Sequence, residues 1–159
     1  MNKQTLLEAI VARLTEELDG YAKAARAAHA EATHEQNKAE NKYDTRGLEA
    51  SYLARGQSRQ VAETEQAISE FRSLALRQFS EKDGVDIGAL VQLEGNGEHS
   101  LYFIGPRAGG TEILHEKKPV LVITPQSPLG QQLTGKKQGD RLQLEIGPLR
   151  DNYRIVSVI

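Results

Sequence analysis

The stretch QSPLGQQLTGKKQGD, residues 126–140, carries the clearest local structural signal in this chain. Ser127 is a residue type that caps helix N-termini. Pro128 suits the first helical position, because its fixed φ matches a helix and its missing N–H would have no partner there. Gly135 is typical of the position that follows a helix. The stretch therefore predicts one short helix that starts after Ser127 and ends before Gly135.

Short runs of β-branched and aromatic residues, separated by glycine and proline, surround this helix. The GNG at 95–97 and the GG at 109–110 precede no helical pattern, so we interpret both as hairpin turns and not as phosphate-binding loops. Together these elements predict an α+β domain in which a small antiparallel sheet packs on one helix. The predicted strands are Ala89–Glu94, Ser100–Ile104, Thr111–Leu114, Val120–Ile123, Arg141–Ile146 and Tyr153–Val158.

The first half of the chain is composed differently. Residues 1–80 hold three of the 14 glycines, no proline and many helix-forming residues. Their apolar residues recur every three or four positions in two stripes, the pattern of two amphipathic helices. The first stripe is Leu7, Ile10, Leu14, Leu18, Tyr21, Ala25, Ala28 and Ala32, and the second is Leu53, Val61, Thr64, Ile68, Phe71 and Leu74.

The turn-forming segment KAENKYDTRGLEA at 38–50 separates the two stripes. This order predicts an antiparallel coiled-coil hairpin over residues 1–79, with arms of roughly 35 residues each. The polar stretch SEKDG at 80–84 marks the boundary with a second domain over 84–159. Large apolar residues near the base of the hairpin give way to alanine and glutamine farther out, so we expect a slender projection whose far end is weakly held.

Composition excludes several classes of function. The 159 residues have a net charge of −2, which argues against a protein that coats nucleic-acid phosphates along its whole surface. There is no cysteine, so disulfides, zinc–thiolate sites and thiol catalysis are excluded. No apolar run is long enough to span a membrane and the first residues are polar, so we expect a cytoplasmic protein with no membrane partner.

The chain carries no recognisable catalytic motif. His29, His34, His99 and His115 lack the spacing of a ligand pair, so they are expected to be solvated, and the isolated protein is expected to hold no metal. No Gly-rich phosphate loop and no GxSxG motif occurs. The sequence therefore offers no support for nucleotide or serine-nucleophile chemistry.

The predicted hairpin tip, near residues 40–49, concentrates charge and permits two interpretations. In the first, it is a solvated turn in which Asp44 caps the second helix. In the second, its carboxylates share a Mg²⁺ ion with the active site of another protein, because Mg²⁺ readily takes one or two carboxylates and keeps its waters. The carboxylates are Glu40, Asp44 and Glu49, and the neighbouring arginines suited to RNA phosphates are Arg46, Arg55 and Arg59.

Two segments resemble a known family. The pattern Ser-Pro-apolar-small followed by Leu-x-Gly-Lys-x-x-x-Asp, here Ser127–Asp140, precedes two terminal strands, and Glu49-Ala-Ser-Tyr52-Leu-Ala-Arg55 lies in the second helix. With a hairpin of about this length ahead of a small sheet domain, the chain resembles the bacterial Gre transcript-cleavage factors. The resemblance implies an FKBP-like sheet domain that docks at the secondary channel of RNA polymerase, while the hairpin enters that channel.

The resemblance also implies how such a protein acts. Tip carboxylates, here Asp44 first, then Glu49 and Glu40, would help to hold a second Mg²⁺ and a water, and the polymerase's own active site would then cut the 3′ end of a backtracked transcript. The protein would be an accessory factor and not an enzyme, with no cofactor of its own and DNA contacts only through the polymerase. We expect the docking contact at Gln126, Ser127, Pro128 and Leu129.

One departure from the family pattern concerns the tip. Cleavage-promoting members usually carry Asp-x-x-Glu-Asn, whereas this chain has Asp44-Thr-Arg-Gly47, so Gly47 stands where the second carboxylate is expected. A cleavage-stimulating member would then use Glu49 or Glu40 in its place. Two alternatives stay open beside that function: a channel-occluding Gre-like inhibitor that does not stimulate cleavage, and a coiled-coil and FKBP-like adaptor for another partner.

Overall fold

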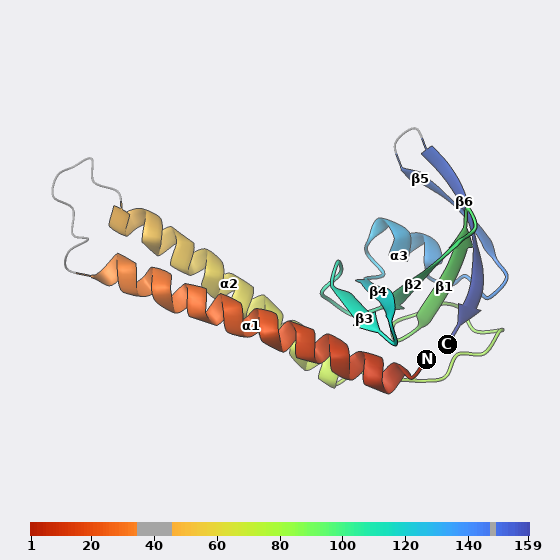
Figure 1. The fold of residues 1–159 in the computed structure, drawn as a ribbon, viewed down its shortest axis with the longest axis horizontal. Helices are drawn as coiled ribbons and strands as arrows, with labels where there is room; N and C mark the ends of the chain where they lie inside the picture. Colours follow the sequence, from red (N-terminus) through yellow and green to blue (C-terminus); the bar gives the residue numbers. More distant parts are fainter. Residues whose placement is uncertain (35–45, 147–148) are drawn as a thin grey trace. The chain divides into compact units, whose positions relative to one another are not determined.

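The computed structural model describes residues 1–34, 46–146 and 149–159. Two long helices come first, followed by six strands with a short helix between the fourth and the fifth (Figure 1). The elements are α1 (Lys3–Thr33), α2 (Arg46–Arg72), β1 (Leu90–Gly95), β2 (Glu98–Ile104), β3 (Glu112–His115), β4 (Lys118–Ile123), α3 (Pro128–Leu133), β5 (Arg141–Ile146) and β6 (Leu149–Val158). This order confirms the expected helical hairpin followed by a sheet-plus-helix domain.

The chain divides into two compact units. One unit is Ala12–Ser69, which contains most of both long helices. The other combines Met1–Val11 with Glu70–Ile159, so the first turns of α1 and the end of α2 pack with the sheet.

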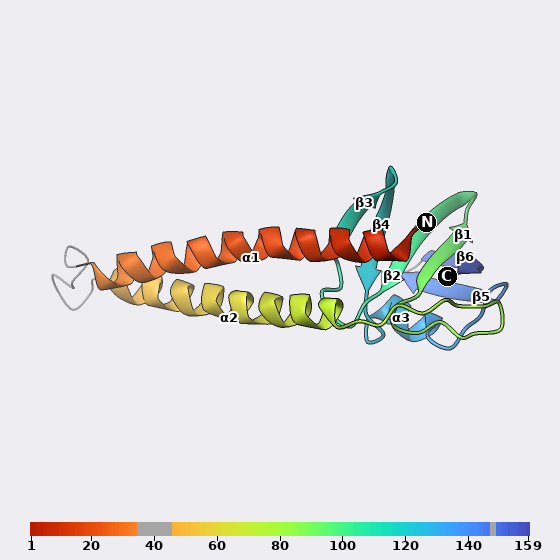
Figure 2. The same cartoon turned by 90° about the horizontal axis from the view of Figure 1, so that it is seen from below.

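Within Ala12–Ser69, α1 and α2 run side by side in opposite directions, as both views show (Figures 1 and 2). Leu14 and Ile68 of the predicted stripes are buried near the base. Farther out, Ala28 of the first stripe is buried, together with Ala54, which lies beside the second stripe. Small side chains let the helices approach closely but bury little apolar area. The predicted change from large to small residues along the arm is therefore present in the structure.

Two residues of the second stripe do not lie where the periodicity predicts. Leu53 is 55% exposed, because the adjacent Ala54 occupies the inward position, and neighbouring residues point about 100° apart around a helix. Leu74 lies beyond the end of α2 at Arg72. The helices are also shorter than expected, with 31 residues in α1 and 27 in α2.

The six strands form one sheet in the order β3-β4-β2-β1-β6-β5. Every neighbouring pair is antiparallel except β2 and β4, which run parallel from Leu101 opposite Val120 to Ile104 opposite Ile123. The sheet is thus mixed, and not wholly antiparallel as expected. The reason is topological: the chain leaves β2 for the edge strand β3 and returns through a hairpin into β4, between β3 and β2.

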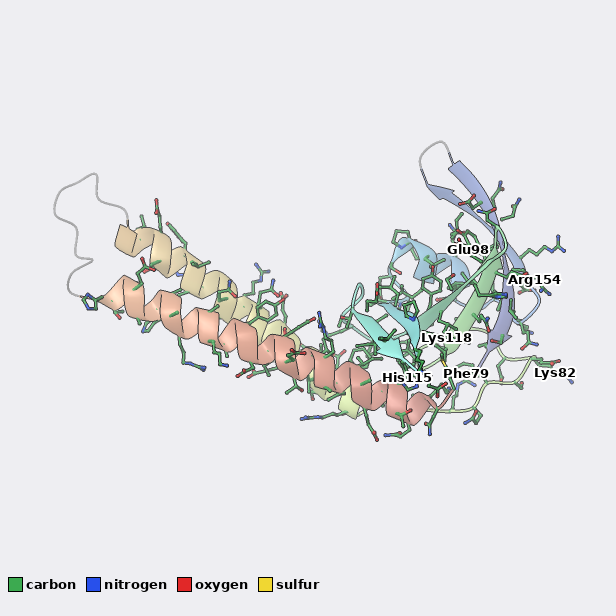
Figure 3. The ribbon with its side chains drawn as sticks, in the orientation of Figure 1. Phe79, Lys82, Glu98, His115, Lys118 and Arg154 are labelled. Carbon is green, nitrogen blue, oxygen red and sulfur yellow. The ribbon has the colours of Figure 1, made fainter. Side chains whose placement is uncertain are left out.

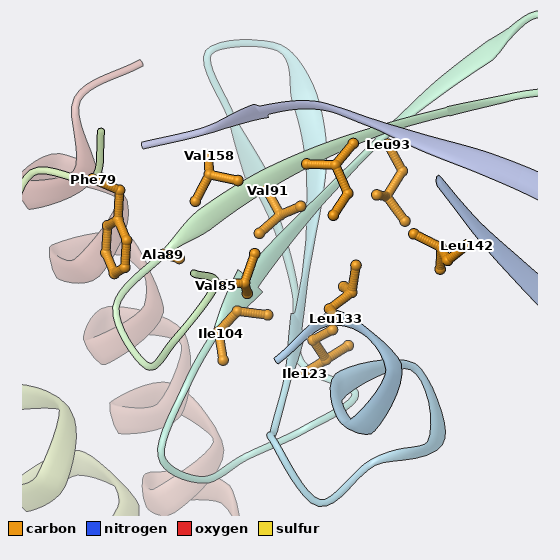
Figure 4. Packing of buried hydrophobic residues seen from close by; sticks show 11 residues of the cluster. Phe79, Val85, Ala89, Val91, Leu93, Ile104, Ile123, Leu133, Leu142 and Val158 are labelled. Carbon is orange, nitrogen blue, oxygen red and sulfur yellow. The ribbon is translucent and has the colours of Figure 1, made fainter. Parts of the chain in front are cut away.

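The hydrophobic core of this unit lies between the sheet and α3 (Figure 4). Leu133 of α3 is fully buried, and Val91, Leu93 and Ile155 project from the central strands into the same cluster. Burial of such side chains stabilises the fold by about 1.5–3 kcal/mol each.

The helix ends pack against the sheet as well. Phe71, near the end of α2, and Phe103 of β2 are both fully buried, with ring centroids 6.5 Å apart. Phe103 alternates with the core residue Ile104 along β2, so it projects from the opposite face of the sheet. Both faces of the central strands are therefore covered.

Of the two predicted hairpin turns, the one at 95–97 is confirmed and the one at 109–110 is wrong. The GNG at 95–97 does join β1 to β2, with Asn96 and Gly97 at φ 54° and 77°. The GG at 109–110 instead lies in the connection from β2 to β3, which are not neighbours in the sheet. The actual β3–β4 turn is Glu116-Lys117, at φ 49° and 64°, and these residue types do not signal a turn that needs positive φ.

Candidate functional site

The segment before α3 is a capped helix start, as the sequence predicts. The Ser127 hydroxyl accepts a hydrogen bond from the Gly130 N–H at 3.0 Å and donates one to the Thr124 carbonyl at 2.7 Å. Ser127 itself is extended, with φ −65° and ψ 157°, and Pro128 opens the helix. A Cβ at Gly130 would lie 1.8 Å from the Thr124 carbonyl oxygen, so the closeness of these two backbone segments requires glycine there.

The four residues predicted to contact a partner, 126–129, lie at this capped N-terminus of α3. Gln126 and Pro128 are exposed, whereas Ser127 and Leu129 are half-buried, with Leu129 packed against the core. The Gln131 side chain donates to the Gln126 carbonyl at 3.2 Å. The segment therefore presents a small surface whose backbone is ordered before any partner binds, which lowers the entropic cost of binding.

The remainder of the 127–140 segment also has structural roles. Gly135 has φ 83° just after the helix, and its N–H donates to the Val85 carbonyl at 2.9 Å. The Asp140 carboxylate accepts a hydrogen bond from the Lys137 N–H at 2.8 Å and closes the turn before β5. The motif that suggested the family is therefore also a local folding unit.

The predicted tip residues are described in part. Glu40 and Asp44 lie outside the described residues, and Arg46 begins α2 with its side chain outside the description. Glu49 is exposed in the first turn of α2. Of the three predicted carboxylates, only Glu49 therefore belongs to the residues that the structure describes. The arrangement of the tip stays a prediction.

The two described arginines of the predicted RNA-binding group lie on the exposed surface of α2. The guanidinium of Arg55 is 5.6 Å from the centroid of the Tyr52 ring, a cation–π distance. Arg59 is paired with Glu63 at 3.4 Å. Sequence reasoning assigned no role to Tyr52, although its exposed fraction is 59%. The helical spacing of Tyr52 relative to the buried Ala50 and Ala54 is the signal that predicts this exposure.

The Lys3 ammonium links the start of α1 to the loop that follows α2 through hydrogen bonds and a cation–π contact. The buried Lys3 ammonium donates to the carbonyls of Arg77 and Gly88 and lies 4.8 Å from the Phe79 ring centroid. Burial, and secondarily the charge of Arg77, lower the pKa of Lys3 below its ordinary value. Nearby, hydrogen bonds from the Ser80 N–H and hydroxyl lower the pKa of the Asp83 carboxyl.

The histidines are not all solvated as expected. His115, labelled in Figure 3, lies in β3. It is only 9% exposed, and its Nε2 is 3.4 Å from the Thr5 hydroxyl and 3.6 Å from the Glu116 carboxylate. Its position in β3 faces the first turn of α1, a long-range contact that the sequence pattern does not indicate. His99 is exposed and contacts the Gln92 amide at 3.1 Å. Within the described residues, no three His, Asp or Glu side chains come together as a metal site.

A cavity of about 480 Å³ lies where the parallel β2–β4 pairing begins. Its lining includes His99 and Tyr102 from β2 and Lys118 and Pro119 from β4. No motif predicted it, because its lining comes from four strands, including Gln92 of β1 and Glu112 of β3. None of the helices in the described part of the chain has both the length and the apolar composition of a bilayer span.

Neither a protein-family model nor a curated protein sequence matches this chain. Among solved structures, GreA factor homolog 1 (Gfh1) of Thermus thermophilus is 22% identical, with 94% of each chain covered and a TM-score of 0.39. A further structure of the transcription factor Gfh1 is 24% identical over 94% of this chain and 93% of that chain, with a TM-score of 0.41. Thermus aquaticus Gfh1 is 22% identical over 95% of this chain and 94% of that chain, with a TM-score of 0.41. The chain is similar to these Gre-factor homologues over nearly its whole length.

Proposed function

We propose that this protein is a transcription elongation regulator of the Gre type. It binds RNA polymerase through Gln126–Leu129 and inserts its helical arm into the secondary channel. The observation that carries the proposal is the capped segment 127–140, which has the family's residue pattern and exposes Pro128 on an ordered backbone. A slender arm with small contact residues at its outer end suits entry into a narrow channel. Such a function places the protein in the cytoplasm.

Replacement of Pro128 tests the docking contact. Pro128→Ala leaves the Ser127 cap intact, so we expect the melting temperature to change little while affinity for core RNA polymerase falls about tenfold, equivalent to about 1.4 kcal/mol. The measurement is a titration of labelled full-length protein with core polymerase. Gln132→Ala, also exposed on α3 but outside the proposed contact, is the matched control and should bind as the wild type does. A folded Pro128→Ala variant with wild-type affinity would rule out this segment as the dock.

The effect on the transcript depends on the tip. A factor that stimulates cleavage supplies carboxylates to the second Mg²⁺ of the polymerase, with Asp44 the first candidate and Glu49, exposed at the start of α2, the second. Gly47 stands where the family's second carboxylate is expected, and this favours occlusion of the channel without cleavage as the second candidate function. The deciding assay is transcript cleavage in stalled elongation complexes at high Mg²⁺, with Asp44→Asn as the variant that removes charge and keeps shape. Binding without stimulated cleavage selects the occluding regulator.

A further inference from the structure

Gly56 lies in the middle of α2, where the helix does not need it. A Cβ there would meet nothing within 4 Å, and its φ is not in the left-handed region. Glycine destabilises a helix interior relative to alanine, because the unfolded chain loses more backbone freedom. Alanine would therefore fit the isolated hairpin and stabilise it. The packing of this chain gives no reason for a glycine at this position.

The neighbours of Gly56 on the helix surface suggest a contact surface. Residues three and four apart share a face, so Tyr52 and Arg59 flank Gly56 on the side away from the buried Ala54. Tyr52 is 59% exposed, and Leu48, one turn earlier, is 55% exposed. We call the exposed residues Leu48, Tyr52, Arg55, Gly56 and Arg59 the outer face of α2. It consists of two exposed apolar side chains, Leu48 and Tyr52, a glycine that leaves the helix surface open, and two cations, Arg55 and Arg59.

This face combines features of a protein contact. Tyrosine and arginine are enriched among residues that dominate interface energies, and Arg55 over the Tyr52 ring restricts both side chains. An exposed leucine beside an exposed tyrosine offers apolar area that a partner can cover. A notch at glycine lets a backbone of the partner approach the helix axis closely.

The apolar residue and the glycine of this face favour one class of partner. Tyr52 and the two arginines suit either a protein or single-stranded RNA, although Glu63 offsets part of the charge of Arg59 at 3.4 Å. The exposed Leu48 and the open space at Gly56 favour a protein, which supplies apolar side chains and a backbone that can approach closely.

We propose that the outer face of α2 packs against the surface of a protein partner. The partner's backbone approaches the helix closely at Gly56, and Tyr52 makes the main side-chain contact. The inference rests on the proposed function, in which that partner surface lines the channel that the arm enters. It adds which side of the arm makes the contact. It also predicts that Gly56→Ala raises the stability of the arm and weakens its binding to the partner.

A second glycine provides the matched control. Gly20, in the interior of α1, also has open space around it, because a Cβ added there would meet nothing within 4 Å. Its surroundings are polar and solvated: Asp19 and Lys23 form an exposed ion pair at 3.0 Å, and Glu16 is exposed one turn earlier. Alanine should therefore stabilise the arm at either glycine, but only the Gly56 variant should disturb a contact.

The test uses the full-length protein and core RNA polymerase without transcript. We expect Gly56→Ala and Gly20→Ala both to raise the melting temperature, and Gly56→Ala alone to weaken binding, about tenfold. Tyr52→Ala, which removes an exposed ring and keeps a helix former, should weaken binding to a similar degree without unfolding the arm. This combination would support the outer face as the contact surface.

Each other result has a distinct meaning. If wild-type protein does not bind core polymerase, the proposed function fails and the inference falls with it. If wild-type protein binds and Gly56→Ala binds equally well, the inference alone is wrong. Equal losses in Gly56→Ala and Gly20→Ala would mean that bending of the arm matters, and not close approach at Gly56. A loss seen only in complexes that contain backtracked RNA would assign the face to RNA and overturn the protein contact.

Discussion

At the scale of single residues, the segment before α3 depends on one hydroxyl. Ser127 both accepts from the Gly130 N–H and donates to the Thr124 carbonyl, so it satisfies one free donor at the helix start and ties the preceding turn to it. Gly130 makes this possible, because any side chain there would collide with the Thr124 carbonyl. Local rules of helix initiation predicted the Ser127 cap, whereas only the structure shows that a glycine is required at position 130.

Removal of that hydroxyl should therefore weaken the fold by a modest and measurable amount. We expect Ser127→Ala to lower the free energy of unfolding by about 1 kcal/mol, the usual loss when a helix cap is removed. Urea denaturation monitored by circular dichroism measures it. Ser127→Thr keeps an oxygen in place and should lose less. Equal losses in both variants would contradict the capping role.

At the scale of elements, the arm formed by α1 and α2 is unevenly held. Leu14 and Ile68 fill the contact near its base, whereas Ala28, Ala50 and Ala54 fill it farther out. Alanine buries much less apolar area than leucine or isoleucine, so separation of the helices costs less free energy at the outer end.

This gradient predicts the pattern of amide hydrogen exchange. Amides near Leu14 and Ile68 should exchange slowly, close to the rate of global unfolding, and amides near Ala28 and Ala54 should exchange faster through local opening. Exchange followed by mass spectrometry at peptide resolution measures both regions in one experiment. Uniform protection along the two helices would show that packing of small residues holds the outer end as firmly as the base.

At the scale of the whole molecule, the change in composition near residues 80–84 does not coincide with the boundary between the two compact units. The compact unit that contains the sheet also includes Met1–Val11 and the chain from Glu70 onward. Leu6, Ile10 and Phe71 are fully buried in this unit, and Phe71 contacts Phe103 on the sheet. The strand-rich half thus relies on helical residues to cover one face.

A fragment of residues 84–159 should therefore fold poorly by itself. Loss of the Phe71 cover exposes Phe103 and Val122, so we expect the fragment to bind the dye ANS and to melt without a cooperative transition. In the intact chain, Phe71→Ala should lower the free energy of unfolding by about 3–5 kcal/mol, as for other buried phenylalanines. A fragment that melts cooperatively at the temperature of the intact chain would contradict this dependence.

Features that are encoded over a few neighbouring residues could be predicted from the amino-acid sequence. Helical stripes, the Ser127 cap, the glycine after α3 and the Asn96-Gly97 turn follow from spacing and from the φ that each residue type tolerates. The parallel pairing of β2 with β4, the burial of His115 and the cavity beside Tyr102 were decided only by tertiary structure. Each of these brings together segments that are distant along the chain. The free energy of such contacts comes from packing and burial in three dimensions, and no local periodicity in the sequence records it.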